Sequence, residues 1–105
     1  MNNLKDRAQA RKPISIARVV LDARMQVCEA LVSGGPDAAL AAVAAQSIRL
    51  CRYVEAGELL PGLAFRALLK VACNLKLPMI LGRSAVRTAL YAGPRLYHQL
   101  DGRAA

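Results

Sequence analysis

The residues best suited to chemistry lie near the C-terminus, in the block GRSAVRTALYAGPRLYHQL. Arg83, Arg87 and Tyr91 recur at every fourth position, so they share one face if a helix extends back to Arg83, and Arg95 follows four residues later. Arginine binds phosphate oxygens in pairs, and a tyrosine ring can stack on a base or hydrogen-bond to a phosphate. The block therefore predicts contacts with nucleic-acid phosphates. The alternative is an amphipathic cap over the helical core, with its arginines in solvent.

A second basic block lies at the N-terminus, where Asp6 is the only acid. Its four cations are Lys5, Arg7, Arg11 and Lys12. We interpret residues 1–13 as a basic arm that orders along a phosphate backbone, with a solubilising tail as the alternative. Between the two blocks, residues 14–57 carry four arginines and four acids and are therefore neutral. A neutral apolar body with basic ends indicates an anionic partner, most often nucleic acid.

Three cations in apolar segments of the chain are candidate partner-interface residues. Arg24 projects from the middle of an apolar arc, either as a stem that reaches solvent at the edge of the core or as a charge facing a partner helix. Arg66 and Lys70 form a thin polar stripe with Asn74 on an otherwise apolar segment. Such a segment suits a central helix or one half of a dimer interface.

Catalysis and metal binding have little support in the sequence. His98 is the only histidine, Asp101 is the only carboxylate near it, and no catalytic triad, acid pair or P-loop is visible. Cys28, Cys51 and Cys73 lie dispersed in apolar stretches without a CxxC pair, so we expect buried, reduced thiols. We predict no enzymatic activity, no cofactor and no metal.

The composition favours an all-α fold. Hydrophobic residues make up 55% of the 105 residues but aromatic residues only 4%, so Ala, Leu, Val and Ile must build the core. We expect a small antiparallel bundle in a single domain, 14–105. Its three main helices are predicted at about 14–32, 36–56 and 61–77, with one or two short C-terminal helices.

Local signals set the expected boundaries of these helices. Ser33-Gly34-Gly35 ends the first helix, and Pro78 stops or kinks the third. Arg18 and Asp22 are expected to pair one turn apart, and Ser84 is expected to cap a short helix at 84–92. The segment RSAVRTAL looks like a DNA-recognition helix, but the connection from residue 74 to 84 is too long for a helix-turn-helix.

The sequence also predicts a cytoplasmic protein without a membrane span. The first 13 residues lack the apolar segment of a signal peptide. The most hydrophobic stretch, 59–81, is interrupted by proline, glycine, arginine and lysine.

Two short segments resemble a known family. Ile14–Met25 (ISIARVVLDARM) and Leu50–Tyr53 (LCRY) are similar to segments of the D subunit of the flagellar master activator, a small helical DNA-binding dimer of similar length. The second half of the chain does not match that family, and no site residues are transferred from it.

Taken together, the residues favour a small basic nucleic-acid-binding regulator or accessory protein that is non-enzymatic and homo-oligomeric, with DNA favoured over RNA. The alternative is a helical protein–protein interaction module, such as an adaptor, chaperone or phage-type inhibitor. Such a module would dock on an acidic or apolar partner surface.

Overall fold

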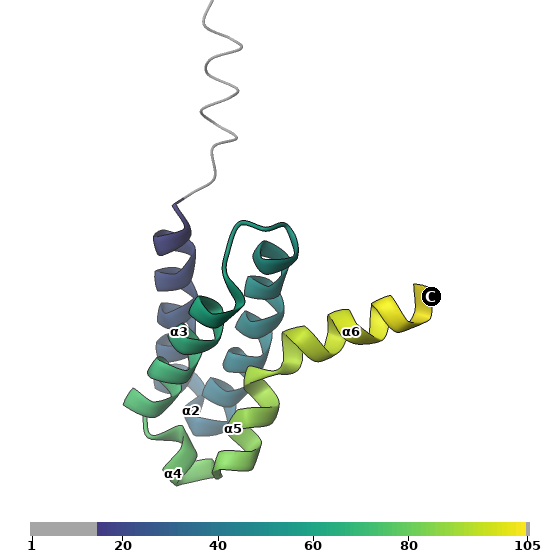
Figure 1. Cartoon of the computed structure of the whole chain (residues 1–105). Helices are drawn as coiled ribbons and strands as arrows, with labels where there is room; N and C mark the ends of the chain where they lie inside the picture. The colour runs from purple at the N-terminus through teal and green to yellow at the C-terminus, as the bar shows by residue number, and fades with distance from the viewer. Residues whose placement is uncertain (1–14, 105) are drawn as a thin grey trace, which may run out of the picture.

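Helices account for nearly all of the described chain (Figure 1). The computed structural model describes residues 15–104, with side chains through His98. The helices are α2 (Ile16–Glu55), α3 (Pro61–Asn74), α4 (Leu77–Leu81), α5 (Arg83–Leu90) and α6 (Ala92–Ala104). No strand occurs in this part of the chain, and the prediction of an all-α fold is confirmed.

The first helical element, α2, reverses direction at Gly35. This glycine leaves the helical conformation, with φ 82° and ψ −173°, and Pro36 begins the second arm of the element. An ion pair of 2.6 Å joins Arg49 to Asp22, which precedes it by 27 residues. A straight helix would hold these residues about 40 Å apart. The two arms of α2 therefore fold back against each other, as Figure 1 shows.

The predicted bundle of three separate main helices is not confirmed. The segments 14–32 and 36–56 belong to one element, in which Ser33 and Gly34 are helical and only Gly35 departs from helical geometry. The expected Arg18–Asp22 pair is also wrong, because the Asp22 carboxylate pairs across the arms with Arg49.

The third predicted helix, 61–77, ends early. Its structural counterpart α3 stops at Asn74, because Lys76 adopts the left-handed conformation with φ 61°. Pro78 therefore lies in the first turn of α4, where its missing N–H costs nothing, and does not terminate α3. Three short elements follow α3, where one or two were predicted.

Small aliphatic side chains form the core, as the composition indicates. They come from both arms of α2 and from α3, α4 and α5, so a single cluster holds these elements together. Close approach of helices needs small side chains at the contact, and alanine supplies them. The fully buried members include Ala23, Val27, Ala39, Val43, Leu50, Ala72 and Leu77.

A buried serine attaches the C-terminal helices to α2. Ser47 is 5% exposed; its hydroxyl donates to the carbonyl oxygen of Leu90 at 2.7 Å and accepts from the N–H of Gly93 at 2.9 Å. A Cβ added at Gly93 would overlap the carbonyl oxygen of Ser47 and lie 2.9 Å from the Cβ of Cys51. The missing side chain thus lets α6 meet α2 directly, and from this contact α6 projects away from the two arms (Figure 1).

By length and composition alone, α2 is apolar enough to cross a membrane. Core helices of water-soluble proteins meet the same criterion. Only 17% of the apolar 18-residue stretch of α2 that meets this criterion is buried inside the protein.

We predict that Gly93→Ala lowers the free energy of unfolding by about 1–3 kcal/mol, because the new methyl group must displace backbone atoms of Ser47. Gly62→Ala is the matched control, since nothing lies within 4 Å of its added Cβ and its φ is not left-handed. That control should leave stability unchanged or raise it by up to about 1 kcal/mol. Urea denaturation of both variants measures the difference, and equal stability would contradict the close contact at Gly93.

Candidate functional site

Arg83, Arg87 and Tyr91 line one groove between α3 and α5. Because α5 begins at Arg83, the three residues lie on the same side, as their spacing predicts. The groove encloses about 580 Å³ and is called the α3–α5 groove below. Its other lining residues are Phe65, Leu69, Cys73, Pro78, Val86 and Leu90. An apolar groove thus carries two exposed arginines and one tyrosine.

An aromatic pair holds Tyr91 in this groove. The ring centroids of Phe65 and Tyr91 lie 5.3 Å apart, and the ring planes are tilted by 42°. Tilted aromatic pairs at this separation are favourable beyond the area that they bury. Tyr91 is nevertheless 43% exposed, so part of its surface remains open to a ligand.

The start of α5 determines how the two arginines align. Gly82 precedes the helix with φ 97° and ψ 149°, which glycine adopts without strain, and Arg83 becomes the first helical residue. The predicted cap at Ser84 is wrong, because Ser84 lies inside the helix and its carbonyl accepts a 3.0 Å hydrogen bond from the Thr88 hydroxyl. The helix therefore starts early enough to place Arg83 one turn before Arg87.

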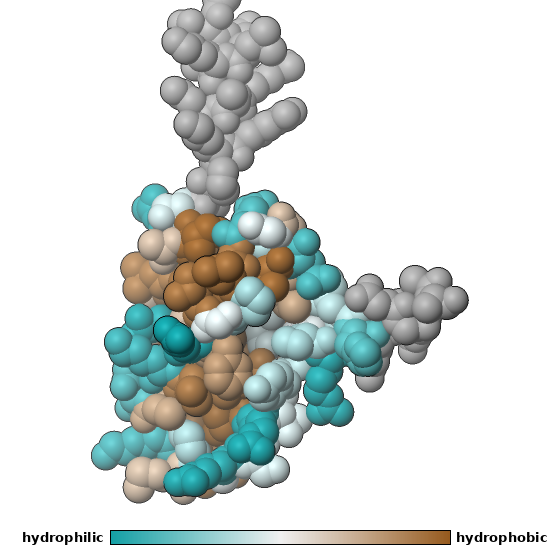
Figure 2. All heavy atoms as spheres, viewed as in Figure 1, coloured by the Kyte–Doolittle hydropathy of each residue, from teal (hydrophilic) through white to brown (hydrophobic). Residues whose placement is uncertain are grey.

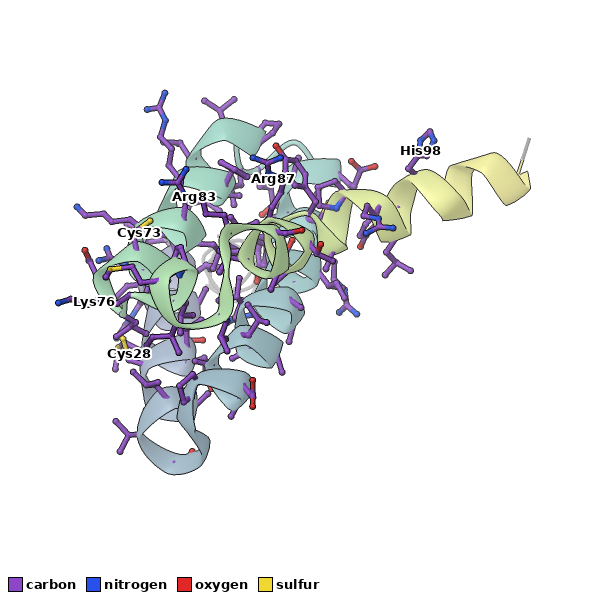
Figure 3. The ribbon with its side chains drawn as sticks, turned by 90° about the horizontal axis from the view of Figure 1, so that it is seen from below. Cys28, Cys73, Lys76, Arg83, Arg87 and His98 are labelled. Carbon is purple, nitrogen blue, oxygen red and sulfur yellow. The ribbon has the colours of Figure 1, made fainter. Side chains whose placement is uncertain are left out.

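The remaining residues of the predicted nucleic-acid interface are not in this groove. Arg95 is exposed on α6, and its backbone N–H donates to the carbonyl of Tyr91 at 3.0 Å. His98, on the same helix, is exposed and lies apart from Arg83 and Arg87 (Figure 3). The predicted N-terminal contacts lie outside the described residues; they are Lys5, Arg7, Arg11 and Lys12.

The basic region is longer than the C-terminal block alone. No Asp or Glu occurs from residue 59 to residue 100, and this acid-free segment holds six cations, so its formal charge is +6. The six cations are Arg66, Lys70, Lys76, Arg83, Arg87 and Arg95. All are exposed, and within residues 15–98 the only ion pair is Asp22–Arg49 in α2. The sequence indicates this segment by the long distance between two successive acids, Glu58 and Asp101. A search for short local motifs does not reveal it.

Arg66 and Lys70 lie together at a second groove, between the first arm of α2 and α3. Its volume is about 390 Å³, and most of its lining is apolar: Ile16, Ala17, Val20, Leu59, Leu63 and Ala67. In Figure 2, apolar surface gathers over the N-terminal part of α3 and the adjoining α2–α3 connection. Arg24, the third predicted partner-interface residue, does not line this groove.

Arg24 is partly buried on α2. Its Nε atom is buried and has no hydrogen-bond partner among the described residues. A buried donor without an acceptor costs free energy, because it loses water without replacement. The structure therefore leaves this side chain with a hydrogen-bonding requirement that the described part of the chain does not meet.

The cysteines differ from the prediction in two of three cases. Cys51 is buried, whereas Cys28 and Cys73 are exposed, and Cys73 lines the α3–α5 groove. Burial raises the pKa of the Cys51 thiol, and the Glu55 carboxylate raises it further. No group of three or more His, Cys, Asp or Glu residues in the described part of the chain is placed to hold a metal ion.

No protein-family model, curated protein or solved structure matches this chain. The function must therefore be inferred from the chain's own residues and their arrangement.

We predict that one thiol of a Cys28→Ser variant reacts quickly with a disulfide reagent and that the second reacts only after unfolding. Cys73 is exposed, whereas Cys51 is buried and its raised pKa keeps it protonated at pH 8. The absorbance of the thiolate released from the reagent, measured with and without urea, gives the number of protein thiols that react before and after unfolding. Two fast thiols would contradict the placement of Cys51, and none would contradict the open groove at Cys73.

Proposed function

We propose that this protein is a small, non-enzymatic nucleic-acid-binding regulator or accessory protein. The observation that carries the proposal is the α3–α5 groove, where exposed Arg83 and Arg87 lie beside Tyr91 within the acid-free segment 59–100. An uncompensated charge of this kind attracts a polyanion and releases its counterions on contact.

Arg83 and Arg87 would bind the phosphate backbone. Side chains one helical turn apart have Cβ atoms about 5–6 Å from each other, so both guanidinium groups can reach one stretch of backbone. Tyr91, with Phe65 packed beside it, offers an exposed ring on which a base or sugar could stack. Arg95 would extend the contact along α6, and the basic arm 1–13 would add phosphate contacts elsewhere.

The proposal includes three further properties. DNA is favoured over RNA, in keeping with the resemblance of Ile14–Met25 and Leu50–Tyr53 to segments of a DNA-binding activator. The protein acts as a homodimer in the cytoplasm. It has no membrane span, since each arm of α2 carries four charged residues that would be costly in lipid.

A second candidate function is a helical protein-interaction module. The observation that favours it is the apolar groove between α2 and α3. Exposed Leu63 lines this groove beside Arg66 and Lys70, and exposed Leu60 is close in sequence. An amphipathic, acidic helix of another protein would suit this combination of apolar surface and positive charge. Arg66 and Lys70 would then contact the acids of that partner.

We predict that Arg83→Gln/Arg87→Gln weakens binding to a labelled 20-base-pair DNA at least tenfold at 50 mM NaCl. The slope of log affinity against log salt should also fall by about 1.8, because two phosphate contacts are lost at about 0.9 each. Arg52→Gln/Lys76→Gln is the matched control: it removes the same charge from two exposed cations that line neither the α3–α5 groove nor the groove between α2 and α3. Fluorescence anisotropy across a salt series measures both effects.

Equal losses in the two double variants would mean that net charge alone governs binding, which contradicts a contact at the α3–α5 groove. Weak binding of the unsubstituted protein at 50 mM NaCl would contradict the nucleic-acid proposal altogether. Purification at low salt separates the two candidate functions, because the chain has three tyrosines, no tryptophan and therefore little absorbance of its own. A stoichiometric protein partner without a raised 260/280 nm ratio would select the interaction module.

A further inference from the structure

A line of apolar side chains on the first arm of α2 faces solvent. Leu21, Met25, Cys28 and Val32 follow one another at spacings of four, three and four residues. Leu21 is 53% exposed, Met25 50% and Val32 89%, and Cys28 is also exposed. We call this line the α2 seam. In Figure 3 the labelled Cys28 lies on the opposite side of the molecule from His98.

The seam is separate from the face of α2 that packs in the core. Val19, Ala23 and Val27 are the buried residues of this arm, and at about 100° per residue they point away from the seam. The core therefore contacts the opposite face of the helix, and no side chain within residues 15–98 covers the seam. Apolar stripes on a folded surface mark sites of association.

The spacing of the seam indicates what covers it. Alternating steps of three and four residues keep a stripe directed toward one neighbouring helix that winds around it, as in a coiled coil. Arg18 occupies the next position before Leu21, and the break at Gly35 follows Val32. The seam thus spans about three helical turns.

Charges on the two edges of the seam favour a second copy of the same helix in parallel orientation. In a parallel pair, the residue before one apolar position faces the residue five places further along the partner helix. Arg24 of each copy would face Glu29 of the other, and within residues 15–98 neither residue has an ion-pair partner. An antiparallel pair would instead bring the edges carrying Asp22 and Glu29 together, and like charges would repel.

We propose that a second copy of this chain docks in parallel on the α2 seam, with Cys28 facing Cys28 across the two-fold axis. The proposal deepens the homodimer that forms part of the proposed function, but it shares no residue with the α3–α5 groove. Three turns bury less than the roughly 800 Å² per partner of a standard interface, so the dimer dissociates on dilution. The two copies of Arg18 meet only at the solvent end of the seam, where salt screens them.

Analytical ultracentrifugation of the full chain between about 5 and 200 µM tests the association, because the dimer has twice the monomer mass of 11.2 kDa. The unsubstituted protein should shift from monomer to dimer over this range. Met25→Asp should remain monomeric throughout, whereas Met79→Asp, at an exposed methionine of α4, should still dimerise. A monomer at every concentration, or a dimer that Met79→Asp disrupts and Met25→Asp does not, would overturn the proposal.

Two further measurements test the orientation and the edge charges. Mild oxidation of a Cys73→Ser variant should give a disulfide-linked dimer, since Cys51 is buried and only Cys28 remains accessible; Cys28→Ser/Cys73→Ser should give none. Arg24→Glu should weaken the dimer at least tenfold, and Arg24→Glu/Glu29→Arg should restore it. A dimer in which oxidation does not link Cys28 to Cys28, or whose affinity is unchanged by the charge exchange, would overturn the parallel arrangement.

The dimer and the nucleic-acid contact can fail separately. Arg83→Gln/Arg87→Gln should dimerise normally, and Met25→Asp should still bind a short single-site DNA as a monomer. Loss of dimerisation in the first variant would contradict the assignment of the interface to α2.

Discussion

The junction between α5 and α6 depends on one buried hydroxyl group. Ser47 joins the end of α5 to the start of α6 by accepting from Gly93 and donating to Leu90, in a place where only glycine fits against the backbone of α2. Tyr91 lies between these two anchored residues, so the same contact holds it beside Phe65. Because Ser47 is buried and has both hydrogen-bond partners, its contacts favour a single arrangement of the junction. A shift of α5 or α6 relative to α2 would leave a buried polar group without a partner.

The two halves of the chain differ in charge. From residue 15 to residue 100, the acids lie on α2 and at Glu58, and the Asp22 carboxylate joins the two arms of α2. Within residues 59–100, which include α5 and the first part of α6, the only charged side chains are cations. One half of the chain thus supplies a neutral scaffold and the α2 seam, and the other supplies a positively charged surface with an apolar groove. A division of this kind would keep the proposed self-association and the proposed polyanion binding on different faces.

The helical class and the alignment of Arg83, Arg87 and Tyr91 follow from the sequence, because composition and four-residue spacing are local properties. The sequence predicts correctly that the first helix ends near Gly35, but it does not predict the geometry of the turn. One residue makes the turn, and Gly34 stays helical. The left-handed conformation of Lys76 ends α3 earlier than predicted, and local helix propensity does not indicate this conformation. The Asp22–Arg49 pair and the role of Ser47 also depend on residues far apart in sequence. The groove could not be predicted for the same reason, since Phe65 and Leu69 come from another helix.

The central claim is that nucleic acid contacts the α3–α5 groove, and photo-crosslinking tests it most directly. A DNA oligonucleotide containing 5-bromodeoxyuridine forms covalent adducts with aromatic side chains that stack on its bases, and mass spectrometry of the digested protein locates them. The account predicts adducts at Tyr91 or Phe65, with Tyr53 of α2 as an internal control that stays unmodified. Adducts at Tyr53 in place of Tyr91 and Phe65, or none in a complex that binds at low salt, would contradict it.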